Sequence, residues 1–335
     1  MKYDKIIEGK FISRSNRFVA YVSVGGMKTK AHVKNTGRLK ELLVDGATVY
    51  LQKHDDPKRS TALSLIAVKK GDQVVNIDSQ APNKAMHEWL AAYMAAENGF
   101  TACGQSAGTS KVYRVITDEP AFGRPITGNP ADGRPMPGDP AFCRPASDGL
   151  ATCTLTSCNP LVRKLTDGFP AAAGKSMARG HTASYPGAFA GNATPAAILR
   201  TGEKITAIRP EYGYRDSRFD FLIETDKRKI LMEVKGVTLE EKGTALFPDA
   251  PTERGVRHIT ELCGSMRDGY YPVIAFVIQM NGVRQFSPNA KTHKEFADAL
   301  VSAHEQGVCI IVLDCEVTRG SMVIRDFVDV VLQQT

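Results

Sequence analysis

The sequence predicts two folded domains, a small N-terminal β-barrel and a C-terminal α/β domain with a mixed sheet. Three features predict this: short strand patterns without a long helix over residues 1–80, alternating strand and helix patterns over 197–335, and a Pro- and Gly-rich stretch between them. The chain of 335 residues, 42% hydrophobic and 24% charged, has the balance of a globular protein with room for two cores.

The first 80 residues favour a closed or nearly closed barrel of the OB type, because five short strands follow one another with turns between them. Side chains alternate in several of them, and Phe18 is expected in the core. A connecting helix over 81–100 follows, with apolar residues at helical spacing from Met86 to Tyr93. The strands are expected over 10–24, 27–33, 47–53, 61–68 and 73–77.

Residues 101–196 are predicted to form a disordered insertion. The hundred residues from 101 to 200 hold 11 of the 18 prolines and 12 of the 29 glycines, a density that few packed domains tolerate. A ten-residue repeat contains the same Arg-Pro pair three times, at Arg124-Pro125, Arg134-Pro135 and Arg144-Pro145. Three copies of so short a repeat cannot bury a core.

Several function classes lack their sequence signals. The segment from Gly168 to Ser176 has five residues between its glycines where a phosphate-binding loop has four, so no nucleotide cofactor is expected. Cys153 and Cys158 lack the CxxC spacing of a zinc site. No apolar run is long enough to cross a membrane and no secretory signal begins the chain, so a cytoplasmic protein is expected. A homo-oligomer is left open.

The C-terminal domain contains the candidate catalytic residues, on a hairpin expected over 218–237. Pairing Ile223 with Ile230 makes one face wholly apolar and sets Asp220 opposite Glu233 on the other face, with Arg218 opposite Lys235. Two opposed carboxylates ionise together only if a cation lies between them, and Mg²⁺ prefers such ligands. The alternative is a cross-strand ladder of salt bridges. Helices expected over 251–266, with Asp249 as N-cap, and 292–305 alternate with strands over 273–279 and 308–313.

The basic surplus lies in the first domain, where residues 1–70 hold 15 Lys and Arg against 6 Asp and Glu. Positive charge of that density suits a nucleic-acid partner, because cationic side chains displace counterions from phosphates. The alternative is a solvated surface and a tight turn. Candidate contacts in this domain are Lys28, Lys30, Lys34, Asn35, Thr36 and Arg38, and those in the second domain are Arg218 and Arg254.

Four segments together carry a family resemblance: Asn35-Thr36-Gly37-Arg38, Ser217-Arg218-Phe219-Asp220-Phe221, Glu233-Val234-Lys235 and the run from Phe247 to Gly255. The chain resembles the sugar fermentation stimulation protein family over about residues 5–100 and 197–330. The resemblance implies an OB-like domain followed by a PD-(D/E)XK nuclease-like domain. It implies Asp220 and Glu233 as metal ligands, Lys235 as catalytic partner, Mg²⁺ or Mn²⁺ as cofactor and DNA as partner.

Three departures from the family pattern qualify the resemblance: the insertion, Arg209 where a further acid is expected, and His293 where the family often has Asp. Two hypotheses follow. The first is a Mg²⁺-dependent DNA phosphodiesterase. The alternative is a non-catalytic DNA-binding regulator of sugar metabolism genes on a nuclease-like fold. A third carboxylate near Asp220 would favour the first, and its absence the second.

Overall fold

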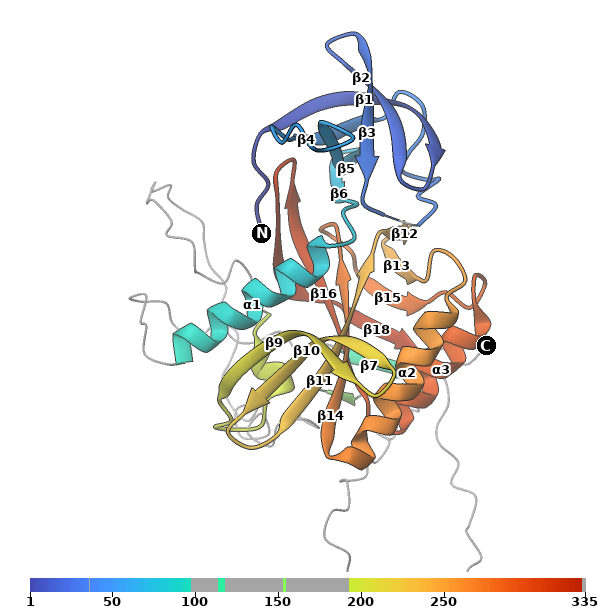
Figure 1. The fold of residues 1–335 in the computed structure, drawn as a ribbon. Coiled ribbons are helices and arrows are strands. Elements are labelled where there is room, and N and C mark those ends of the chain that lie inside the picture. The colour runs from blue at the N-terminus through green and yellow to red at the C-terminus, as the bar shows by residue number, and fades with distance from the viewer. Residues whose placement is uncertain (36, 98–113, 118–152, 155–192, 333–335) are drawn as a thin grey trace, which may run out of the picture.

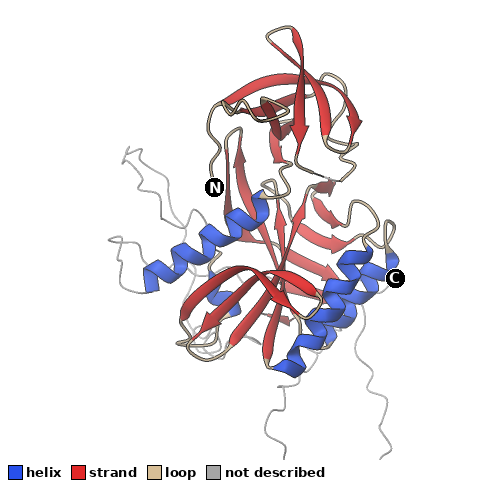
Figure 2. Ribbon diagram, in the orientation of Figure 1, coloured by secondary structure: helices blue, strands red, loops and turns tan. Residues whose placement is uncertain are grey.

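A computed structural model describes residues 1–35, 37–97, 114–117, 153–154 and 193–332. Figure 1 shows the barrel at one end of the molecule and a larger α/β body beneath it, with α1 leading from one to the other. Figure 2 shows that strands make up most of both parts. The predicted order of domains is therefore the order seen in space.

The N-terminal domain is a closed barrel with strand order β3-β2-β1-β4-β5-β6, in which pairing of β3 with β5 completes the closure. Alternating residues such as Ala20, Val22, Ala31 and Val33 are fully buried inside it. The strands are β1 Ile6–Asn16, β2 Val19–Val24, β3 Met27–Val33, β4 Thr48–Lys53, β5 Leu63–Lys70 and β6 Gln73–Asn76.

The strand expected over 10–24 is wrong, because two strands, β1 and β2, occupy this stretch with a turn at Arg17 and Phe18. The side chain of Asn16 makes the turn, since its Oδ1 accepts a hydrogen bond from Phe18 N at 2.9 Å. Phe18 is 51% exposed at this turn, so its expected place in the core is also wrong.

Helix α1 (Ala81–Glu97) connects the two domains and buries Met86, Trp89 and Leu90 against the larger one. The indole Nε1 of Trp89 donates to Ala193 O at 3.0 Å. At the base of the barrel, Gln279 Nε2 donates to Asn76 O at 3.0 Å. The domains are thus joined by packing and by hydrogen bonds as well as by the chain.

The central sheet of the second domain has the order β17-β16-β14-β11-β10-β9. Neighbours β11, β14 and β16 are parallel and the others antiparallel, which gives the mixed sheet that was predicted. Figure 1 shows α1 on one side of this sheet and the pair α2 and α3 on the other. The strands are β9 Ile205–Tyr214, β10 Ser217–Thr225, β11 Lys229–Val237, β14 Tyr270–Ile278, β16 Cys309–Thr318 and β17 Ser321–Phe327.

Helices α2 (Glu253–Ser265) and α3 (Lys294–Glu305) lie close to their predicted positions. The expected N-cap of α2 at Asp249 is wrong: the hydroxyl of Thr252 accepts from Gly255 N at 3.0 Å. Short 3₁₀ helices lie at Pro195–Ile198 and Met266–Asp268. None of the helices in the described ranges has the length and apolar character needed to cross a membrane.

A third sheet, which the sequence did not predict, has the order β12-β13-β15-β18-β7-β8. Strands β7 and β8 belong to the stretch predicted as an insertion, and most of that stretch, with its repeat and Cys158, lies outside the described residues. The strands are β12 Leu239–Glu241, β13 Thr244–Phe247, β15 Gln285–Pro288, β18 Asp329–Leu332, β7 Arg114–Thr117 and β8 Cys153–Thr154.

Candidate active site

The β10–β11 hairpin has the predicted register where the strands pair, with Phe221 opposite Met232 and Ile223 opposite Ile230. Its ladder ends at Phe221, so the predicted pairs further along are not strand partners. There the Asp220 carboxylate replaces a backbone carbonyl as the hydrogen-bond acceptor, and its Oδ2 accepts from Val234 N at 2.7 Å. This bond fixes the Asp220 side chain against β11.

Glu233 is the most enclosed acidic group of the cluster, at 3% exposure. Its Oε1 accepts from Lys235 Nζ at 2.6 Å and contacts His258 Nδ1 at 2.6 Å. Burial acts to raise the pKa of Glu233, but the His258 hydrogen bond and the Lys235 charge outweigh it and hold the pKa below its ordinary value. Glu233 is therefore the carboxylate that stays ionised.

Asp220 has the opposite electrostatic setting. Burial raises its pKa to about 6, and the nearby Glu233 charge adds to this rise. Hydrogen bonds from Val234 N and from Asn83 Nδ2, the latter 2.5 Å from Oδ1, act against the shift. A cation beside the two carboxylates would relieve their repulsion.

Helix α2 supplies the support for Glu233. His258 is 2% exposed, and its Nε2 accepts from Arg254 Nε at 3.3 Å, which leaves the Nδ1 proton to be donated to Glu233. The ring also lies against Phe219, with centroids 5.6 Å apart. Arg254, a predicted nucleic-acid contact, is thus connected to Glu233 through His258.

The carboxylate oxygens of Asp220 and Glu233 suit a small divalent cation, and one of these oxygens has no partner among the described residues. Glu233 Oε2 is buried and has no hydrogen-bond partner, which is costly for a carboxylate oxygen unless a cation or water satisfies it. Asp220 and Glu233 would be the protein ligands. Within the described residues, no group of three or more His, Cys, Asp and Glu side chains is arranged to hold a metal ion.

A cavity of about 480 Å³ opens beside Asp220. Lys2, Lys34 and Lys84 line it together with Asn83, and Glu88 and Glu211 line it as well, so the cavity carries charge of both signs. Lys34 also pairs with Asp78 at 3.3 Å. Glu88 lies 2.7 Å from the N-terminal ammonium and Glu211 lies 3.0 Å from Arg218, so the charges of Lys2 and Lys84 can attract an anionic group toward Asp220.

The other predicted contacts are spread over the molecule. Lys28 lies over the Tyr21 ring at 4.8 Å, and it and Lys30 are exposed on β3. Arg218 Nη1 lies 3.0 Å from Glu211 Oε2 at the surface. Asn35 and Arg38 line a second cavity, and Thr36 lies outside the described residues.

The positions where the sequence departs from the family pattern also have partners. Arg209 Nη2 lies 2.8 Å from Glu224 Oε2, at the surface of β9 and β10. His293 is buried before α3, where its Nδ1 lies 3.5 Å from Thr252 N.

Asn83 is a site residue that the sequence did not single out. It lies in the first turns of α1, and only the packing of α1 on the sheet brings it to Asp220. The only sequence signal available was an amide at the start of a helix that leads from a basic domain to an acidic motif.

Comparison with known proteins supports the two-part architecture. Residues 12–77 match the SfsA N-terminal OB domain, and residues 184–321 match the sugar fermentation stimulation protein RE domain. A sugar fermentation stimulation protein homolog from Clostridium beijerinckii is 38% identical over 332 residues, covering 99% of this chain and 100% of its own. A homolog from Ruminiclostridium cellulolyticum is 38% identical over 330 residues, covering 98% and 99%.

One solved structure with the same architecture is that of Pyrococcus furiosus SfsA in complex with Ca²⁺. It aligns with a TM-score of 0.58 at 22% identity, covering 98% of this chain and 97% of that one. At this identity the likeness concerns the fold. Together with the barrel and the mixed sheet, it confirms the predicted fold class, an OB-like barrel followed by an α/β domain with a mixed sheet.

Proposed function

The chain belongs to the sugar fermentation stimulation protein family, and we propose that it hydrolyses phosphodiester bonds in DNA with Mg²⁺ or Mn²⁺. One observation carries the proposal. A buried carboxylate with an unsatisfied oxygen, Glu233, lies beside a second carboxylate of raised pKa, Asp220. The Ca²⁺ named for the Pyrococcus relative is consistent with a divalent site in this family.

Each residue of the cluster has a role in the proposed reaction. Asp220 and Glu233 would hold the cation, which when bound would lower the pKa of a water ligand and polarise a phosphate oxygen. Lys235, 2.6 Å from Glu233, directs its ammonium toward the negative charge that gathers on the phosphate. His258 keeps Glu233 ionised and oriented, and the lysines beside Asp220 attract the DNA.

A second candidate function is DNA binding without cleavage, with an effect on genes of sugar metabolism. One observation favours it. Asn83, an amide, occupies Asp220 Oδ1 at 2.5 Å, and the described residues bring no third carboxylate to the pair. The two candidates share the basic surfaces and differ only in chemistry. In both, a cytoplasmic location is proposed, which suits the free thiols of Cys263 and the buried Cys315.

Cleavage of labelled single- and double-stranded DNA with Mg²⁺ or Mn²⁺, and with EDTA as blank, tests the proposal. Asp220→Asn and Lys235→Ala are expected to lower the rate by about 100-fold or more. Glu224→Gln is the matched control, because Glu224 lies on the same strand but pairs with Arg209 at the surface. Binding without metal-dependent cutting would select the second candidate, and neither binding nor cutting would reject both.

A further inference from the structure

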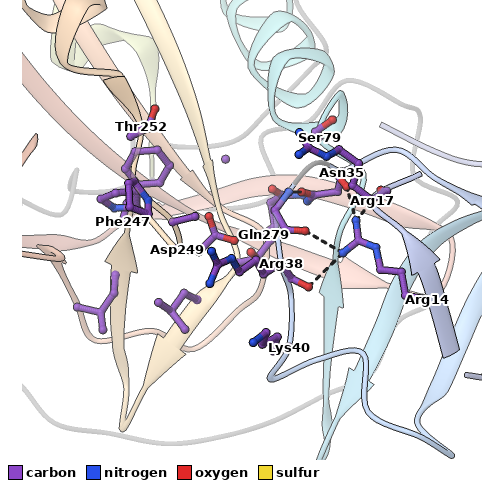
Figure 3. A pocket seen from close by; sticks show the side chains of 18 of the residues that line it. Arg14, Arg17, Asn35, Arg38, Lys40, Ser79, Phe247, Asp249, Thr252 and Gln279 are labelled. Carbon is purple, nitrogen blue, oxygen red and sulfur yellow. Dashed lines mark hydrogen bonds between the residues drawn. The ribbon is translucent and has the colours of Figure 1, made fainter. Parts of the chain in front are cut away.

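A cavity of about 790 Å³ lies between the barrel and the second domain (Figure 3). Four cationic side chains line it, Arg14, Arg17, Arg38 and Lys40, against the single carboxylate of Asp249. We propose that this inter-domain cleft binds the phosphate backbone of single-stranded nucleic acid. The proposal takes its class of ligand from the proposed function but does not require cleavage.

Arg14 organises the barrel wall of the cleft. Its guanidinium donates to the carbonyl oxygens of Gly37 at 2.8 Å, Arg38 at 3.1 Å, Arg17 at 2.6 Å and Asn35 at 2.6 Å. Figure 3 shows these bonds from Arg14 to the loop. Because four carbonyl oxygens are turned toward Arg14, they do not face an incoming anion.

The loops that Arg14 holds present three further cations. Arg17, Arg38 and Lys40 are exposed, so their charges are available to phosphates that enter the cleft. Phe18 follows Arg17 in the β1–β2 turn, is not among the residues that line the cleft, and is 51% exposed, an unusual state for a large apolar side chain. Basic residues with an exposed aromatic ring are the combination that holds single strands, because bases stack on the ring.

The close approach of the two domains argues for a single strand over a duplex. A Cβ on Gly37 would lie 2.6 Å from Asp249 Oδ2, so the barrel loop and the second domain approach closely where both line the cleft. The opposite wall is the segment from Phe247 to Thr252 together with Gln279. Because the two domains approach closely here and both line the cavity, the cavity suits a single strand better than the wider duplex.

The cleft also lies next to the cavity beside Asp220. Lys34 lines that cavity, and the next residue, Asn35, lines the cleft. Near the start of α1, Ser79 likewise lines the cleft and Asn83 lines the cavity beside Asp220. A strand held in the cleft would therefore have its continuation close to Asp220.

Fluorescence anisotropy of labelled oligothymidylate of about 15 nucleotides, in EDTA so that no cutting occurs, tests the cleft. Arg17→Ala with Lys40→Ala is expected to weaken binding about tenfold and to reduce the salt dependence by about 1.4 in log–log slope. Phe18→Ala is expected to weaken it by a similar factor. The matched control is Lys53→Ala with Lys58→Ala, which removes the same charge from exposed positions of the same barrel outside the cleft and is expected to stay within about twofold.

Equal losses in the two double variants would mean diffuse attraction and overturn the proposal. A blunt-ended duplex of the same length that binds more tightly than the single strand would also overturn it. Binding that behaves as expected in a protein that never cuts DNA would leave the cleft standing and reject the proposed hydrolysis. Cutting that Asp220→Asn abolishes, together with unchanged binding by the cleft variants, would reject the cleft and leave the proposed hydrolysis standing.

Discussion

Charge has opposite roles in the Asp220–Glu233 cluster and in the loop whose carbonyl oxygens bind Arg14, which we call the Arg14 loop. In the cluster, Glu233 is buried and Asp220 is half-buried on neighbouring strands, and burial together with the charge of Glu233 raises the pKa of Asp220 to about 6. In the loop, one cation at the barrel surface satisfies four backbone carbonyl oxygens. Arg14 thus satisfies the backbone around it, although its own Nε is buried without a hydrogen-bond partner in the described part of the chain, whereas Glu233 Oε2 is an acceptor to which none of these residues donates.

This difference has a consequence for substitutions. Removing a charge from a satisfied network leaves polar groups without partners and destabilises the fold. Removing a charge from a strained pair relieves repulsion and stabilises the fold at the expense of function. The two regions should therefore respond with opposite signs.

Arg14→Met is expected to have the largest effect, a loss of about 3 kcal/mol in the free energy of unfolding, because four carbonyl oxygens lose their donor. Urea denaturation followed by circular dichroism measures it. Arg17→Ala, in the adjacent turn, is the control and should change stability by no more than about 0.5 kcal/mol. Equal changes in the free energy of unfolding for the two variants would contradict the structural role of Arg14.

Asp220→Asn is expected to stabilise the protein by about 2 kcal/mol at pH 8 in EDTA and by little at pH 4. The folded-state pKa of this acid, about 6, is above the ordinary 3.8, so the stability it contributes when protonated is lost as the pH rises from about 4 through 6. Urea denaturation at the two pH values checks the sign. A variant less stable than wild type at pH 8 would contradict the strained pair.

Gly37→Ala is expected to cost about 2 kcal/mol, since the new methyl group would lie 2.6 Å from Asp249 Oδ2 and force the barrel away from the second domain. Gly213→Ala is the matched control, because a Cβ there meets nothing within 4 Å. Thermal unfolding of both variants makes the comparison. Two unchanged melting curves would show that the loop yields at no cost.

Arg218→Ala should have the smallest effect, less than about 0.5 kcal/mol, because its ion pair with Glu211 is solvent-exposed. It contrasts directly with Arg14, an arginine that bonds to backbone from a partly enclosed position. The same denaturation series provides the value. A loss as large as that of Arg14→Met would show that exposure does not separate the two arginines.

The sequence predicted the cluster better than the cleft, for a physical reason. Alternation along β10 and β11 is a local pattern, and the register of Phe221 with Met232 followed from it. The contact between Asn83 and Asp220 depends on how α1 crosses the sheet, which no local pattern encodes. The spacing of residues along α2 likewise does not reveal that the His258 ring meets Glu233.

In the barrel too, local sequence patterns predicted some features and missed others. Its strands followed from alternation and turns, yet the β1–β2 turn was not predicted, because a single Asn16 side chain makes it. The third sheet was not predicted because its strands are short, as with Leu239–Glu241 and Asp329–Leu332, and come from distant parts of the chain. Lys28, Lys30, Lys34 and Arg38 were among the predicted contacts, but Arg14 and Arg17 were not, because their place beside the cleft is a property of the folded barrel.

The cation site is tested most directly by a titration of the Asp220 carboxyl group with carbon-detected NMR, in EDTA and then in millimolar Mg²⁺, assigned with Asp220→Asn. We expect a pKa near 6 without the cation and a fall to below the ordinary 3.8 with it, because Mg²⁺ would neutralise the repulsion from Glu233. A pKa that stays near 6 in Mg²⁺ would contradict the claim that Asp220 and Glu233 form a cation site.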